Sequence, residues 1–148
     1  RLLGDAVGDL LNNGVNSTWI DILDPNNDYI KDVASVQRGL SETLSNANLD
    51  FQHQQTEDPM ILLSSLDGGA LVGIYMVDTY TIIPKEPGDA VAIAGDEAVL
   101  LGTSGSATGI ETRYGAMLLF HIPVTGGDAK VRLLGATQQL LTAVALGS

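Results

Sequence analysis

Asp78 is the residue whose surroundings most need a chemical explanation. It follows the run Gly73-Ile74-Tyr75-Met76-Val77 inside an apolar segment, where a buried carboxylate without a partner would be strongly unfavourable. We therefore expect Asp78 to have a partner. The first interpretation is a structural ion pair with Arg113 or Arg132, and the second is a polar group that lines a pocket.

The two histidines are the other candidates for proton chemistry. His121 lies near a predicted strand end, opposite Arg132, and is interpreted as a structural residue rather than a proton shuttle. His53 shares a predicted strand face with Leu49 and Phe51, which indicates packing. The candidate ligand-binding residues are therefore Asp78, Arg113, His121 and Arg132, and no catalytic or metal-binding residue is assigned.

Other motifs do not complete a site. A calcium loop beginning at Asp24 would need Gly at its sixth position and Glu at its twelfth, where the chain has Tyr29 and Ser35. The segment from Gly102 to Gly109 lacks the Gly-Lys-Ser/Thr ending of a phosphate loop. The chain has no Cys, which excludes thiol catalysis and cysteine-held metals. We expect no cofactor, transition metal or nucleotide.

Composition favours one globular domain. The 148 residues are 45% hydrophobic and only 17% charged, with 17 Gly, which is typical of a chain rich in strands and loops. The chain has no internal repeat, and no change of amino-acid composition along it indicates a second domain. We expect a single domain over residues 1–148, with residues 1–23 as a helical arm and residues 24–148 as a helix-on-sheet core.

The chain is strongly acidic, with 18 Asp and Glu against 7 Lys and Arg and a net charge of −11. Such a charge repels phosphate backbones, so nucleic acid is not an expected partner. No apolar run approaches the ~20 residues that a transmembrane helix needs. We therefore expect no transmembrane segment in this chain.

Two helices are predicted first. Residues 2–11 carry apolar side chains at helical spacing, and Asn12-Asn13-Gly14 follows as a stop signal. Asp24-Pro25 predicts an N-cap, and the helix that it begins would continue to Asn46. Gly39 weakens this helix and would mark a close approach to a sheet. The expected buried stripe is Tyr29, Val33, Val36, Leu40 and Leu44.

From residue 49 the apolar period changes to two, which predicts strands. Residues 60–66 and 70–83 flank Asp67-Gly68, a dipeptide typical of a two-residue type I′ hairpin turn. A short apolar stretch follows at 97–102, and residues 102–109 are predicted to form a surface loop. Residues 137–146 fit both a helix and a strand, and we predict a strand.

The last third of the chain allows a prediction of register. A hairpin loop from Val124 to Ala129 would bring the arms together with Arg132 opposite His121. The predicted apolar pairs are Ile122 with Val131, Phe120 with Leu133, and Leu118 with Gly135.

Helices followed by strands indicate an α+β fold. We expect N-terminal helices packed on a curved, mainly antiparallel sheet, with the capped helix across its concave face. Cystatin-like and NTF2-like architectures have this shape.

Residues 60–146 carry several strand and turn patterns that resemble those of one protein family. They are Gly69-Ala70-Leu71-Val72, the strand end Thr81-Ile82-Ile83-Pro84-Lys85, the strand from Tyr114 to Pro123, and the stretch from Lys130 to Gln139. Together they resemble the C-terminal domains of secreted actinobacterial lipoproteins. The resemblance implies a location in the cell envelope and an uncharacterised role, and it transfers no catalytic residue.

Two functions follow as hypotheses. The first is a non-catalytic extracytoplasmic domain that binds a protein or a small molecule through its sheet face or edge. Association between copies of the chain through the same surfaces falls within this class. The alternative is a small enzyme with a cone-like cavity, in which Asp78 and His121 form an acid/base pair. A cytoplasmic location is the alternative to the envelope.

Overall fold

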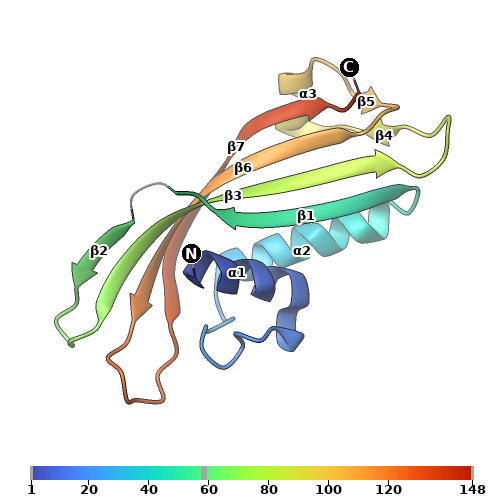
Figure 1. Cartoon of the computed structure of the whole chain (residues 1–148). Helices are drawn as coiled ribbons and strands as arrows, with labels where there is room; N and C mark the ends of the chain where they lie inside the picture. The colour runs from blue at the N-terminus through green and yellow to red at the C-terminus, as the bar shows by residue number, and fades with distance from the viewer. Residues whose placement is uncertain (1, 58–59, 148) are drawn as a thin grey trace.

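The computed structural model describes residues 2–57 and 60–147, in which two long helices precede a sheet (Figure 1). This arrangement confirms the predicted α+β class. No helix in the described residues is long and apolar enough to cross a membrane. The elements, in chain order, are α1 (Leu2–Asn13), the 3-10 helix η1 (Gly14–Asn16), α2 (Asp28–Thr43), β1 (Ala47–Gln55), β2 (Ile61–Ser64), β3 (Ala70–Pro84), β4 (Val91–Ala92), α3 (Gly95–Leu101), β5 (Gly105–Ser106), β6 (Ile110–Ile122) and β7 (Arg132–Ala145).

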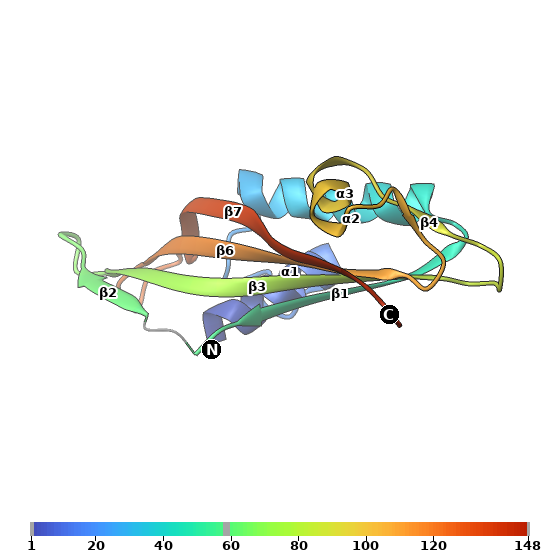
Figure 2. The same cartoon turned by 90° about the horizontal axis from the view of Figure 1, so that it is seen from above.

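The main sheet is antiparallel, with the strand order β1-β3-β6-β7, and β2 pairs with one end of β3. It twists strongly along its length (Figure 1), and α2 and α3 lie on the same side of it (Figure 2). Side chains alternate between the two faces of a strand. We call the face that carries the even-numbered residues of β3 the covered face, because those from Val72 to Ile82 are buried. The opposite side is the open face.

The main hydrophobic core lies between the covered face and the two N-terminal helices. Val7 and Leu10 of α1 and Ile30 and Val33 of α2 are almost fully buried there. Burial of one such side chain contributes about 1.5–3 kcal/mol, so this contact holds the helices on the sheet. The buried cluster consists of Ala6, Val7, Leu10, Leu11, Leu23, Ile30, Val33, Val72, Ile74, Met76, Ala116, Leu118, Phe120 and Leu133.

Two glycines let α1 approach β1 closely. A Cβ atom on Gly8 would lie 3.1 Å from the carbonyl oxygen of His53 and 3.2 Å from its Cβ. A Cβ atom on Gly4 would overlap that of Gln55, whose side-chain oxygen accepts a hydrogen bond from the Gly4 backbone N–H at 3.2 Å. The absence of side chains at these positions therefore allows α1 to cover His53.

The second helix begins later and ends earlier than predicted. Its N-cap is Asn27, whose side chain accepts a hydrogen bond from the Tyr29 backbone N–H, so the prediction of Asp24 as the cap is wrong. The Asp24 side chain instead accepts from the Asn26 backbone N–H in the preceding turn. Gly39 has no atom within 4 Å of the position where its Cβ would lie, so the predicted close approach to the sheet is wrong as well.

The strand predictions hold in outline, but the β2–β3 turn and the segment from residue 97 to 109 differ from the predictions. The β2–β3 hairpin pairs Ser64 with Ala70 across a five-residue loop, in which Gly68 has a positive φ and Asp67 does not, so it is not the two-residue type I′ turn. The apolar stretch at 97–102 lies mostly in α3, and residues 105–106 of the expected loop form β5. The strand predicted at 137–146 is confirmed within β7.

The predicted register of the last hairpin is confirmed at its turn end. Phe120 pairs with Leu133, and His121 pairs with Arg132. A bulge between Leu119 and Phe120 then shifts the ladder by one residue, so Leu118 lies opposite Ala136 rather than Gly135. The ladder ends at Arg132, and the pairing of Ile122 with Val131 remains a prediction.

Alanine substitutions at Gly39 and at Gly4 should have opposite effects on the free energy of unfolding. Gly39→Ala should raise it by about 0.5–1 kcal/mol, because alanine favours the helix and meets free space. Gly4→Ala should lower it by about 1–3 kcal/mol, because the new methyl group overlaps Gln55. Urea unfolding of both variants measures the difference, and a stabilised Gly4→Ala would contradict the close packing of α1.

Candidate functional site

The buried carboxylate of Asp78 is the centre of a polar network. Its side chain has no solvent exposure. Oδ1 lies 2.7 Å from Nδ1 of His53, whose side chain is also fully buried. Oδ2 accepts two further hydrogen bonds, from the Tyr29 hydroxyl at 3.0 Å and from Nε2 of Gln138 at 2.8 Å. The carboxylate thus has three partners from three different elements.

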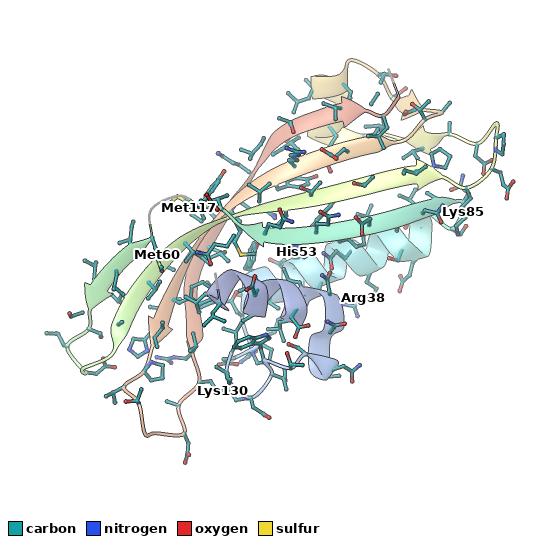
Figure 3. The ribbon with its side chains drawn as sticks, in the orientation of Figure 1. Arg38, His53, Met60, Lys85, Met117 and Lys130 are labelled. Atoms are coloured by element: carbon teal, nitrogen blue, oxygen red, sulfur yellow. The ribbon has the colours of Figure 1, made fainter. Side chains whose placement is uncertain are left out.

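Each partner is positioned by its own element. His53 lies directly opposite Asp78 in the β1–β3 register, on the part of β1 that passes the helices (Figure 3). Tyr29 lies in the first turn of α2, which the Asn27 cap fixes. Gln138 comes from β7 and pairs with Ala116 of β6, whose small side chain leaves room for the amide to reach β3.

The network continues beyond His53 into α2. The imidazole Nε2 lies 2.7 Å from Nε2 of Gln37, which is buried in the middle of the helix. If the ring hydrogen is on Nδ1, the imidazole donates to Asp78 and its Nε2 accepts from the Gln37 amide. All buried side-chain nitrogen and oxygen atoms in the described residues have hydrogen-bond partners. The network is therefore complete within the protein.

Two adjoining cavities form a cleft between α2 and the covered face. We call this feature the α2 cleft. Its first part has a volume of about 490 Å³ and lies at the N-terminal end of α2, and the second, of about 510 Å³, lies toward the C-terminal end. Val36, Tyr80 and Tyr114 line both parts. The cleft therefore extends beneath most of the helix.

The two ends of the α2 cleft differ in polarity. The first part is lined by polar groups that include Asp28, Tyr29, Asp32 and Gln138. The second is mainly apolar, and only Thr43, Glu97 and Thr112 there bear polar side chains besides the shared tyrosines. The apolar lining consists of Leu40, Leu44, Ile82, Ala92, Ile93, Ala94 and Ile110.

Three tyrosines of the cleft wall keep their hydroxyl protons to unusually high pH. Burial raises the pKa of Tyr29 well above its usual value, and the Asp78 carboxylate raises it further. Burial and then Asp78 raise the pKa of Tyr80 in the same way. Burial raises the pKa of Tyr114, whose hydroxyl donates to the carboxylate of Glu97. The Tyr80 and Tyr114 rings are 5.3 Å apart between centroids.

Neither Asp78 nor His53 is among the residues that line the α2 cleft. Tyr29 and Gln138 stand between the carboxylate and the cleft, because both bind Asp78 and both line the first cavity. A general acid or base must come within hydrogen-bond reach of the proton that it transfers. The buried pair therefore holds two residues of the polar wall in place and does not itself line the cleft.

The prediction that Arg113 or Arg132 pairs with Asp78 is wrong. Arg113 pairs with Glu111 at 2.9 Å, and it lies opposite Thr79, on the open face. Arg132 lies opposite His121 on that same face. Asp78 is on the covered face, so strand alternation separates it from both arginines. The expectation that Asp78 has a partner is correct, and His53 fills that place.

The predicted pairing of Asp78 with His121 is also wrong. His121 lies opposite Leu71 on the open face, seven residues along β3 from Asp78, which corresponds to about 24 Å. Its Nε2 contacts the Asp67 carboxylate at 2.9 Å. The pKa of Asp67 is lowered mainly by the Gly69 backbone N–H, next by Ser65, and only to a smaller extent by His121.

Sequence reasoning missed His53, Tyr29, Gln37 and Gln138 as partners in the network. The packing interpretation of His53 is right about its covered position but did not identify Asp78. A usable signal was present, since His53 and Asp78 are both polar residues on the apolar sides of predicted strands. The register that joins them was not deducible, because β2 and its hairpin separate β1 from β3 in the chain.

Replacement of Asp78 by Asn should lower the free energy of unfolding by about 3 kcal/mol. An amide offers one acceptor oxygen and one donor nitrogen, so at least one of the three partners of Asp78 would face another donor. Asp50→Asn on exposed β1 is the matched control and should change stability by less than about 0.5 kcal/mol. Equal unfolding midpoints and slopes in urea for both variants would refute the importance of the network.

Alkaline pH should destabilise the fold through the tyrosines. Their pKa values in the folded state exceed the unfolded value of about 10, so their contribution to stability is complete below pH 10 and is lost as the pH rises through the folded-state pKa values. Tyrosinate absorbance should appear together with unfolding, and Tyr29→Phe should weaken the pH dependence. Ionisation of Tyr29, Tyr80 and Tyr114 near pH 10 in an intact fold would contradict this.

Comparisons with family models, curated proteins and solved structures find no match to this chain. The geometry of the α2 cleft and of the Asp78 network is therefore the basis on which a function is argued.

Proposed function

We propose that this chain is a non-catalytic binding domain that takes a small amphipathic molecule into the α2 cleft. The observation that carries this proposal is the change of polarity between the two adjoining parts of the α2 cleft. Tyr29 and Gln138 lie at its polar end, whereas Leu40 and Ile82 lie at its apolar end. Such a gradient matches a molecule with a polar head and a hydrocarbon tail.

The dimensions of the cleft support this proposal. Its parts, of about 490 and 510 Å³, fall within the range typical of small-molecule sites, about 300–1,000 Å³. Such sites combine an apolar wall with a few polar groups that fix the orientation of the ligand. The Asp78 network is suited to that second task, because it holds the Tyr29 hydroxyl and the Gln138 amide in fixed directions.

The non-catalytic role is supported by the position of the strongest acid/base candidates. His53 and Asp78 are fully buried and lie outside the cleft lining. Their hydrogen bonds are satisfied by protein atoms, which suits a structural role. An extracytoplasmic location is part of the same proposal and rests on the resemblance of residues 60–146 to domains of secreted lipoproteins.

A substitution that fills the cleft tests the binding proposal. Val36 is half exposed and lies between the two cavities, so Val36→Trp should obstruct both without disturbing the core. Val15→Trp, in exposed η1, is the matched control. We expect at least one of 1-octanol, octylammonium and octanoate to bind the unmodified chain, and the cleft variant to bind it at least tenfold more weakly while the control retains affinity.

Calorimetry and NMR titration provide the measurements. The chemical-shift changes should concentrate at residues of α2 and at Tyr80, Ile82 and Ile110. Failure of all three probes to bind, or equal affinity for the unmodified chain and for Val36→Trp, would overturn the proposed function.

A further inference from the structure

We propose that the ligand of the α2 cleft is an organic cation, in which an ammonium group binds between Tyr29, Asp32 and Gln138 and a hydrocarbon tail extends along α2 toward Ile82. This inference rests on the proposed binding function and specifies the head group that the site selects. It is derived from the hydrogen-bonding capacity, the charge and the aromatic character of the cleft wall.

Several hydrogen-bond donors of the polar wall are already used inside the protein. The Tyr29 hydroxyl donates its one hydrogen to Asp78, so its oxygen can only accept from a bound molecule. Gln138 uses one of its two amide hydrogens on the same carboxylate, and its carbonyl oxygen is an acceptor. The Tyr114 hydroxyl donates to Glu97. An acceptor-rich wall of this kind favours a ligand that supplies donors, as an ammonium group does.

The charged residues along the cleft are all acidic, and they favour a positively charged ligand as the acceptors do. Asp28 and Asp32 are exposed at the polar end, and Glu97 lies beside the apolar end. Among the lining residues, all within the described part of the chain, there is no Lys, Arg or His. The α2 N-terminus contributes roughly half a positive charge, which the two aspartates outweigh. The local field therefore favours a cation.

Aromatic rings complete a site for a positive head group. Tyr29, Tyr80 and Tyr114 line the polar cavity together, and an aromatic face attracts a cation within about 6 Å of its centre. Their raised pKa values keep all three hydroxyls neutral at physiological pH. The rings can therefore contact an ammonium group in this cavity while Asp32 supplies the opposite charge.

Three probes with eight carbons each and different head groups separate this inference from the binding function. Octylammonium, 1-octanol and octanoate should bind in that order of affinity, with octylammonium at least tenfold tighter than the alcohol at physiological salt. Asp32→Asn should weaken octylammonium several-fold and leave 1-octanol unchanged. Asp21→Asn, an exposed loop position outside the cleft lining, controls for the overall negative charge and should change neither affinity.

The outcomes distinguish the two proposals. If 1-octanol or octanoate binds as tightly as octylammonium, and Val36→Trp abolishes that binding, the cation inference is wrong and the amphiphile-binding function stands. If Asp21→Asn weakens octylammonium as much as Asp32→Asn does, the cation is held by general charge attraction and the inference is again wrong. If none of the probes is sensitive to Val36→Trp, the proposed function itself fails.

Discussion

A fully buried carboxylate is the constraint on which the rest of this structure depends. Asp78 stands in the middle of β3, where its transfer from water is unfavourable unless several donors compensate it. The donors come from β1, α2 and β7, so satisfaction of one side chain requires these three elements to take fixed positions around the sheet. The same requirement orients the polar wall of the α2 cleft.

The support of this network extends to residues that make no polar contact with it. Gly8 lets α1 lie against the backbone of His53, and Ala116 leaves space for Gln138 to cross β6. Larger side chains at these positions would separate the donors from the carboxylate. The small residues Gly8 and Ala116 thus leave the space that α1 and Gln138 occupy. The geometry of the polar network and the close packing of α1 therefore depend on each other.

Much of the fold could be predicted from periodicity, because apolar spacing alone distinguishes the helices from the strands. The pairing of Phe120 with Leu133 followed from a short loop, whereas the bulge beyond it has no simple signature in one sequence. The site was harder to predict. Asp78 was correctly expected to need a partner, but the choice of Arg113, Arg132 or His121 assumed a shared face, and strand alternation puts all three on the other side.

The wide sequence separation within the network has a consequence for how the chain folds. Asp78 is 25 residues from His53, 49 from Tyr29 and 60 from Gln138. Contacts between such distant segments form slowly, because the entropy of closing long loops is lost before the contacts stabilise the chain. The carboxylate therefore stays hydrated until β1, β7 and α2 have all assembled. Interactions made after the rate-limiting step slow unfolding more than they speed folding. A network that forms last would therefore chiefly slow the unfolding of the finished molecule.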